Sequence, residues 1–380
     1  MPDSSFLSWP FFDERHRELA RDLADWCAAN LAGRYAENLD DECRALVREL
    51  GAAGFLKLTV SDSKHRADVR SLAVARETLA YHSGLADFAF AMQGLGSGAI
   101  SLFGTVEQKR EWLPKVASGQ AIAAFAMTEP ECGSDAANMQ TSAMRDGNEW
   151  VLVGEKTYIS NGGIADFYVT FARTGEGEGA RGLSAFVVPA TAVEIAERID
   201  VIAPHPLARL RYDNVRIPAG AIIGEPGEGF RIGMETLTLF RVTVGAAALG
   251  FARRALDEAL AFAKNRRLGS GSLAENAVTQ EKLADMGVAI DGSALLVYRA
   301  AWQQDEGGVD NRRAAAMAKL HATESAQQVI DAAVQMHGGA GVTRGVRVEE
   351  LYRDIRALRI YEGASEVQRQ IIAKDMLKGG

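Results

Sequence analysis

The spacing of apolar residues changes twice along this chain, and these changes limit the folds that it can adopt. Between residues 121 and 229, short segments rich in β-branched and aromatic residues are separated by Gly, Asp, Asn and Pro; they are EWVLVGEKTYIS, DFYVTFAR, LSAFVVPA and RLRYDNVRIP. Segments of this kind are typical of strands joined by turns. Asp146-Gly147 in AMRDGNEW is a strong hairpin signal. The stretch therefore predicts a small antiparallel barrel or sandwich.

The sequence on both sides of this stretch is helical. RHRELARDLADWCAANLA and VEQKREWLPKVASG precede it. After it, apolar residues recur at three- and four-residue spacing in two stripes, Val244, Ala248, Phe251, Ala255, Ala259 and Phe262, then Leu283, Met286, Ile290, Ala294 and Val297. Such stripes indicate long helices packed in a bundle. We expect an α+β chain that is mostly α, with an N-terminal helical domain (1–120), a middle β domain (121–229) and a C-terminal helical bundle (230–380).

The composition disfavours several classes of protein. The chain has 380 residues, of which 47% are hydrophobic and 24% charged, as in a soluble protein with two or three packed domains. A net charge of −8 disfavours nucleic-acid binding, which usually requires a basic face. Three cysteines without a CxxC pair fit a reducing compartment, and the first residues lack a secretory pattern. No apolar stretch is as long as about 18 uncharged residues, so we expect a cytoplasmic protein without a membrane span.

Two kinds of site, a dinucleotide-binding loop and a metal site, are disfavoured by the sequence. Gly177, Gly179 and Gly182 form a literal GxGxxG, but a dinucleotide fingerprint follows a strand and opens a helix. This one lies between two predicted strands, so we interpret it as a hairpin loop. The six histidines are scattered without ligand spacing, so we expect no metal site.

The segment TEPECGSD, residues 128–135, allows three interpretations. Cys132 could be a nucleophile, although no histidine lies near it in the sequence. The two carboxylates could belong to a metal loop. Alternatively, Pro130 and Gly133 could shape a turn in which Ser134 and backbone N–H groups bind an anion. A plain turn, stabilised by its own side chains, explains the segment about as well.

Three further polar clusters occur later in the chain. TYISNGG (157–163) ends a predicted strand, and HGGAG (337–341) has glycines that allow a close backbone approach to a ligand. RIYEGASEVQR (359–369) places Glu362 between an aromatic residue and a glycine, ahead of a helical run. Burial would raise the pKa of such a carboxylate and make it a candidate general base. A solvated carboxylate at a helix start is the simpler alternative.

These features, in this order, resemble the acyl-CoA dehydrogenase family over nearly the whole chain. The matching segments are GTVEQKREWLPKVASGQ, AFAMTEPECGSDAANMQTSA, GEKTYISNGGIADFYVTFAR, VRIPAGAIIGEPGEGFRIGM, VQMHGGAGV and LYRDIRALRIYEGASEVQRQIIA. The resemblance implies an N-terminal helical domain, a middle antiparallel β-barrel and a C-terminal four-helix bundle.

The resemblance also implies that the chain binds FAD. The run from Phe125 to Ser134 would wrap the flavin ring and pyrophosphate, with Cys132 as a spacer. Ser134 would lie where the flavin and the acyl carrier meet. The implied flavin contacts in the middle domain are Phe125, Met127, Thr128, Gly133, Ser134, Tyr158, Ile159 and Ser160.

A second group of residues is implied to contact FAD across a subunit boundary. Arg266 would reach the FAD of a neighbouring subunit, and the other implied contacts are Gln335, Gly338, Gly339, Ala364 and Glu366. The run Leu268–Ser270 departs from the family pattern. Glu366 stands where the family often has Gln, and it would place a negative charge near the diphosphate. Such sharing implies at least a homodimer, and the resemblance to the family implies a homotetramer, a dimer of dimers.

The implied reaction is α,β-dehydrogenation of an acyl thioester. Glu362 would take the α proton while the β hydrogen moves as hydride to flavin N5. The implied substrate contacts are Ser134, Thr238, Arg241, Tyr361 and Gly363. Thr238 stands where the family often has an acidic residue that contributes to carrier binding, so an acyl-carrier protein is an alternative to CoA.

The electron acceptor and the acyl group are less constrained. The resemblance implies transfer to an electron-transfer flavoprotein; an oxidase that uses oxygen and a non-catalytic flavin-bound homologue are the alternatives. The segment from Ala91 to Ser101 is rich in small residues. These residues indicate either space for an acyl chain or close helix packing.

Overall fold

The computed structural model describes residues 3–34, 37–61, 67–307 and 310–378. These residues divide into two compact units that do not follow the order of the chain. Unit 1 comprises the described residues within Met1–Arg34, Asp68–Asp87 and Arg241–Gly380; unit 2 comprises those within Tyr35–Ala67 and Phe88–Phe240. The division into three domains at residues 120 and 229 stays a prediction.

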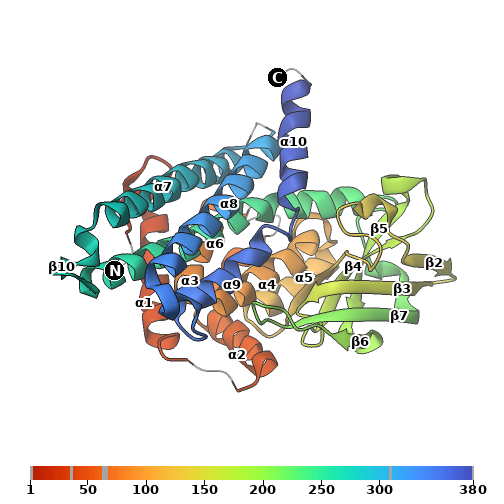
Figure 1. The fold of residues 1–380 in the computed structure, drawn as a ribbon. Helices are drawn as coiled ribbons and strands as arrows, with labels where there is room; N and C mark the ends of the chain where they lie inside the picture. Colours follow the sequence, from red (N-terminus) through yellow and green to blue (C-terminus); the bar gives the residue numbers. More distant parts are fainter. Residues whose placement is uncertain (1–2, 35–36, 62–66, 308–309, 379–380) are drawn as a thin grey trace. The chain divides into compact units, whose positions relative to one another are not determined.

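Unit 2 contains the predicted sheet. Its described residues form eight strands in the order β6-β7-β3-β2-β4-β5-β8, with β1 paired to β4. The strands are β1 (Ala123–Ala126), β2 (Ser142–Asp146), β3 (Glu149–Ser160), β4 (Phe167–Arg173), β5 (Leu183–Pro189), β6 (Glu194–Arg198), β7 (Leu207–Pro218) and β8 (Ile222–Ile223). The long strands β3 and β7 lie side by side (Figure 1) and pair antiparallel. Two pairings, β1 with β4 and β2 with β4, are parallel, and the sequence pattern did not predict them.

Both predicted hairpins occur in this sheet. Strands β2 and β3 pair antiparallel with Asp146 opposite Glu149, and Gly147 takes a positive φ of 59° in the two-residue turn. Strands β4 and β5 also pair antiparallel, with the GEGARG segment between them. The GxGxxG match is therefore a hairpin loop.

Unit 2 also contains helices. The helices α2 (Leu39–Ala52) and α5 (Val106–Ala117) lie within it, and α4 (Gly84–Phe103) and α6 (Gly229–Asn265) belong partly to each unit. The start of α5 is fixed by a capping box, in which Thr105 and Gln108 each accept the other's backbone N–H.

The small residues of α4 pack against neighbouring elements. A Cβ atom on Gly96 would lie 2.6 Å from the backbone carbon of Ala123, and one on Gly94 would lie 2.5 Å from the Phe240 ring. Gly98 would meet both Thr236 and Phe240 at less than 3.0 Å. Close helix packing therefore accounts for these three glycines, and they are no argument for space for an acyl chain.

Replacing Gly96 by alanine is expected to destabilise the protein by about 1–3 kcal/mol, because the backbone of Ala123 cannot move aside. Gly287, inside α7 (Ala277–Glu306), is the matched control, since a Cβ there meets nothing within 4 Å. Gly287→Ala should stabilise the protein by up to about 1 kcal/mol. Thermal unfolding midpoints measure both changes, and equal midpoints for the two variants would contradict this packing argument.

Unit 1 is a set of helices drawn from both ends of the chain. Besides α7 and the parts of α4 and α6 that belong to it, unit 1 contains α1 (Glu14–Asn30), α3 (Val69–His82), α8 (Arg312–His337), α9 (Arg347–Leu358) and α10 (Ser365–Leu377). The helices α7 and α8 run side by side (Figure 1). The predicted stripes are buried, except that Phe262 and Leu283 are half-buried. A short hairpin of β9 (Arg267–Leu268) and β10 (Gly271–Ser272) follows α6 and contains the Leu268–Ser270 run.

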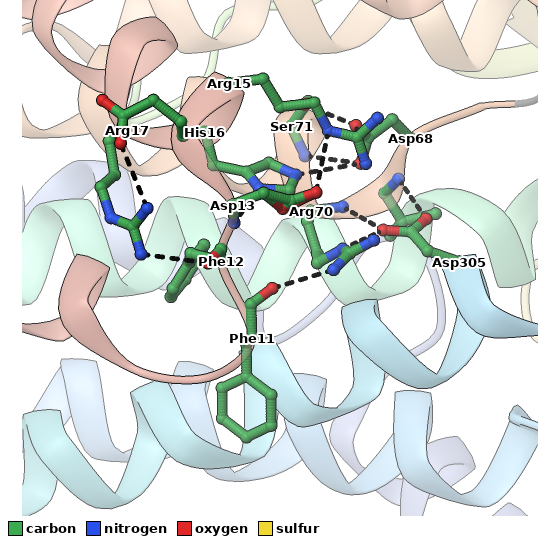
Figure 2. Close-up of polar contacts among 12 residues, drawn as sticks. Phe11, Phe12, Asp13, Arg15, His16, Arg17, Asp68, Arg70, Ser71 and Asp305 are labelled. Atoms are coloured by element: carbon green, nitrogen blue, oxygen red, sulfur yellow. Dashed lines mark hydrogen bonds and ion pairs between the residues drawn. The ribbon is translucent and has the colours of Figure 1, made fainter.

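Polar contacts join the N-terminal helices to α7 within unit 1 (Figure 2). Asp305 near the end of α7 accepts hydrogen bonds from the Val69 backbone N–H at 2.7 Å and from the Arg70 Nε at 2.7 Å. The buried His16 of α1 accepts the Asp13 backbone N–H at 3.0 Å and lies 3.5 Å from Asp68. These contacts explain why α1 and α3 group with the C-terminal helices.

Among the described residues, α6 alone is long and apolar enough to cross a membrane, and 78% of its most apolar window is buried in the structure. The core helix of a soluble protein meets the same criterion.

Candidate active site

Glu362 lies on a strained turn between α9 and α10. Its φ is +52°, and that of Gly363 is +95°. A left-handed conformation is unfavourable for a residue with a Cβ atom, and such residues are frequent at functional sites. Tyr158 is another non-glycine residue with a positive φ, at +54°. Two sequence-predicted site residues thus take an uncommon backbone conformation.

Two helices hold the Glu362 turn in place. The Gly363 carbonyl accepts hydrogen bonds from Lys319 Nζ of α8 at 2.9 Å and from Gln368 Nε2 of α10 at 2.7 Å. After the turn, the Ser365 hydroxyl donates to Glu324 of α8 at 2.6 Å. The sequence analysis identified none of these supporting residues, because their partners are 5 to 44 positions away.

The environment of the Glu362 carboxyl raises its pKa. Burial is the main cause, and the charge of Asp87 adds to it, whereas Arg76, Lys319 and Arg241 oppose it. The side chain as a whole is half-buried, but its Oε2 is buried and has no hydrogen-bond partner among the described residues. We attribute the raised pKa to this enclosed oxygen rather than to the exposed part of the side chain.

Two arginines near Glu362 differ in their partners. Arg76 of α3 forms a two-pronged contact with Asp87, with both nitrogen–oxygen distances at 2.8 Å. Arg241 of α6 is only 6% exposed, and its Nε has no hydrogen-bond partner in the described part of the chain. A guanidinium keeps its proton in proteins. Unit 1 therefore contains a buried carboxylate oxygen and a buried cationic donor that are both available to a polar ligand.

The segment 125–134 is organised by a buried ion pair in unit 2. Glu129 accepts backbone N–H groups from Gln140 at 2.6 Å and Thr141 at 2.9 Å. Lys156, which is 0% exposed, donates to Glu129 at 2.8 Å and to the Met127 carbonyl at 3.0 Å. Lys156 was missed by the sequence analysis; a lone lysine within the strand pattern EWVLVGEKTYIS was the available signal.

The two predicted flavin segments of unit 2 meet at their backbones. The Thr157 N–H donates to the Thr128 carbonyl at 2.9 Å. Tyr158 is 64% exposed, whereas Ile159 is 1% exposed and lies in the sheet core. Ile159 therefore presents almost no surface to a ligand, and its carbonyl already accepts the Gly162 N–H at 3.0 Å. Ser160 is half-buried at the end of β3.

The apolar side chains of the first segment pack inside unit 2. The half-buried Phe125 ring lies 4.8 Å from that of Phe171. A Cβ on Gly233 would lie 2.3 Å from the Met127 side chain, so a glycine lets α6 approach this segment.

Cys132 is not suited to be a nucleophile. Its thiol donates to the Asp135 carbonyl at 2.7 Å, and burial raises its pKa. The neighbouring Gly133 and Ser134 are exposed, and a Cβ on Gly133 would meet nothing within 4 Å. Among the described residues, no group of three His, Cys, Asp or Glu side chains could hold a metal ion.

The predicted contacts in unit 1 fall into two groups. The Phe262 ring near the end of α6 lies 4.3 Å from that of His337 at the end of α8. Phe262, four residues before Arg266, thus contacts the segment from Gln335 to Gly339. Ala364 and Glu366 adjoin the Glu362 turn, beside Glu324 in the middle of α8. Eleven residues of helix, about 16 Å, separate Glu324 from Gln335.

The negative charge of Glu366 has a local explanation. Its exposed side chain lies in the first turn of α10, where the helix dipole favours an acidic residue.

Comparison with known proteins matches nearly the whole chain. The domain models described as acyl-CoA dehydrogenase N-terminal, middle and C-terminal domains match residues 13–120, 124–215 and 227–377. A 3-(aryl)acrylate reductase of Clostridium sporogenes is 35% identical over 97% of this chain and 100% of that protein. The mitochondrial short-chain specific acyl-CoA dehydrogenase of Bos taurus is 36% identical over 96% of this chain and 90% of that protein.

The chain belongs to the acyl-CoA dehydrogenase family. It is an oxidoreductase that acts on acyl-CoA. Among solved structures, a glutaryl-CoA dehydrogenase of Mycobacterium smegmatis in complex with FADH2 is similar, with a TM-score of 0.89, 28% identity, and coverage of 98% of this chain and 97% of that chain. The predicted fold class is confirmed.

The residues present fit the flavin that acyl-CoA dehydrogenases are expected to carry. Gly133 in unit 2, and Gly338 and Gly339 in unit 1, each face open space, where a Cβ would meet nothing within 4 Å. Glycines placed in this way let a ligand approach the backbone closely. In addition, the buried Glu362 Oε2 and Arg241 Nε have no hydrogen-bond partner among the described residues, so both atoms can bind a polar ligand.

Proposed function

We propose that the chain catalyses FAD-dependent α,β-dehydrogenation of an acyl-CoA thioester, with Glu362 as the general base. The observation that carries this proposal is the buried, unpartnered Oε2 of Glu362 on a strained turn, with a raised pKa. A base with a pKa closer to working pH holds a removed proton better than an ordinary carboxylate does.

In this reaction the residues of the chain bind, orient and take the proton. Glu362 removes the α proton of the thioester, and Lys319 and Gln368 keep its turn fixed through the Gly363 carbonyl. Arg241 holds the thioester end, with Tyr361 and Gly363 beside it. When bound, FAD accepts the β hydrogen together with its electron pair.

We propose that two groups of residues hold FAD. In the middle segment they are Phe125, Met127, Thr128, Gly133, Ser134, Tyr158, Ile159 and Ser160, and in unit 1 they are Arg266, Gln335, Gly338, Gly339, Ala364 and Glu366. The exposed Tyr158, which stands where the family often has Trp, is the side chain best placed to contact a ring. The proposal includes a homodimer or homotetramer, a cytoplasmic location and an electron-transfer flavoprotein as acceptor.

The carrier is the part of this proposal with a specific competitor. The Thr238 hydroxyl donates to the Met234 carbonyl of its own helix at 2.8 Å, so this position offers no charge and no free donor to CoA. An acyl group on a carrier protein is therefore the second candidate substrate. Ser134, which is exposed, is common to both proposals.

Anaerobic bleaching of the flavin absorbance tests the function. The purified protein is mixed with acyl-CoAs of different length, branching and ring content, and separately with acyl-carrier-protein thioesters. Fast bleaching by a CoA thioester supports the proposal, and bleaching by carrier-protein thioesters alone supports the second candidate. Reoxidation by oxygen rather than by an electron-transfer flavoprotein would indicate an oxidase. Bound flavin that no thioester bleaches would contradict both candidates.

A further inference from the structure

Lys319 is a buried cation without an acidic partner. It is 0% exposed on α8, and no carboxylate of the described residues forms an ion pair with it. Its only hydrogen-bond acceptor there is the Gly363 carbonyl, at 2.9 Å. Burying a charge without a carboxylate in direct contact is costly, so this lysine is expected to reduce the stability of the fold.

The hydrogen bond alone does not require a lysine. Gln368 Nε2 donates to the same Gly363 carbonyl at the shorter distance of 2.7 Å. A neutral side chain therefore already fixes this oxygen. What Lys319 adds, and Gln368 cannot, is a positive charge beside the residue that follows Glu362.

The other charged groups around Glu362 do not replace the positive charge of Lys319. Arg76 of α3 is compensated by Asp87 of α4, and the Nε of Arg241 of α6 has no hydrogen-bond partner among the described residues. The charges of Glu324 on α8 and Glu366 on α10 also favour the protonated form of Lys319, whereas that of Arg241 disfavours it. Burial lowers the pKa of Lys319 to about 8, and Glu362 is the strongest influence opposing that decrease.

We propose that Lys319 is a positioning residue for Glu362, which holds the Gly363 carbonyl and keeps the neighbouring base ionised. This inference rests on the proposed function, because it assumes that Glu362 is the base. The lysine would counteract the enclosure of the carboxyl, so that the base is protected from water and is still deprotonated in the resting enzyme.

The test compares two variants that each remove one donor to the same oxygen. Lys319→Met removes a donor and a charge, whereas Gln368→Met removes a donor alone. The rate constant for flavin reduction is measured against pH, with the CoA thioester that bleaches the wild type. The acid limb should move to higher pH in Lys319→Met, by up to about one unit, since loss of a positive charge that favours the carboxylate raises the pKa of Glu362. In Gln368→Met the rate should fall without movement of the limb.

Lys319→Gln provides a second neutral variant in case the methionine variant does not fold. It retains a donor for the Gly363 carbonyl but not the charge, so its acid limb should also move to higher pH. Thermal midpoint and FAD content are measured for every variant. If the acid limb lies at the same pH in the Lys319 variants as in Gln368→Met, the inference is overturned and Lys319 has a structural role alone. Normal turnover in Glu362→Gln would instead reject the base assignment, and with it the proposed function.

Discussion

Replacing Glu362 by glutamine is expected to slow flavin reduction by about 10²- to 10⁴-fold, the usual contribution of a general base. The amide has nearly the same shape as the carboxylate but cannot accept the α proton. The turn should survive, because Lys319 and Gln368 hold it through the Gly363 carbonyl rather than through the Glu362 side chain. Stopped-flow absorbance of the anaerobic enzyme after mixing with a reactive thioester measures the rate.

Stability and FAD content separate loss of chemistry from loss of structure. Burial raises the pKa of Glu362 in the folded protein, so ionisation of this carboxyl costs stability, and the cost appears as pH rises above its unfolded value. Glu362→Gln should therefore have an equal or higher thermal midpoint near neutral pH and an unchanged FAD content. Glu281→Gln, at an exposed position on α7, is the matched control and should reduce flavin at the wild-type rate. A Glu362→Gln enzyme that also reduces flavin at that rate would refute the assignment.

The fold was predictable where local pattern decides it. The β-branched segments became strands β3, β4, β5 and β7, and Asp146-Gly147 marked a hairpin. The stripes beginning at Val244 and Leu283 became the buried faces of α6 and α7. The pairing of β1 with β4 could not be predicted in this way, because parallel neighbours are joined by long connections that leave no local signal.

The grouping of α1 and α3 with the C-terminal helices was likewise hidden in the sequence. It depends on contacts such as Asp305 with Val69, which are 236 residues apart. Composition and periodicity describe each segment by itself, and they contain no information about pairings at such separations.

The candidate site shows the same limit. Glu362 was identified as a candidate because its neighbours in the sequence form a recognisable segment, and its role as the base stays a prediction. Its left-handed φ, its unpartnered Oε2 and its support by Lys319 arise from tertiary structure. The small residues of α4 were ambiguous in the sequence: they indicated either space or packing, and the contacts of Gly94, Gly96 and Gly98 decided for packing.

The carboxylates of TEPECGSD also needed the structure. Glu129 is a buried partner of Lys156, whereas Glu131 is exposed. A sequence pattern gives both the same weight, although one of them organises the segment that we propose to hold the flavin. The contribution of Glu129 is therefore open to direct measurement.

Breaking the Lys156–Glu129 pair is expected to destabilise the protein by about 3–5 kcal/mol, because removing one partner leaves the other charge buried alone. Lys156→Met also deprives the Met127 carbonyl of its donor at 3.0 Å. We therefore expect Lys156→Met to lose FAD as well as stability. Urea unfolding measures the first effect, and flavin absorbance per protein measures the second. The Lys156→Met, Glu129→Gln double variant should be less destabilised than the sum of the single variants, since neither charge then remains.

The neighbouring Glu155 supplies the control for this pair. Glu155 of β3 is partly exposed and pairs across the sheet with Arg209 and, at 3.1 Å, with Arg211 of β7; Glu155→Gln should cost no more than about 1 kcal/mol. The acid dependence provides a second check. Burial raises the pKa of Glu129, but Lys156 and the Gln140 N–H outweigh it and hold the pKa below its ordinary value of 4.5. Its contribution is thus complete above that value and disappears as pH falls through the lower folded pKa. In Glu129→Gln, the free energy of unfolding should therefore fall less steeply as pH decreases in the acid range. An unchanged pH dependence of that free energy would mean that the pair does not stabilise the segment.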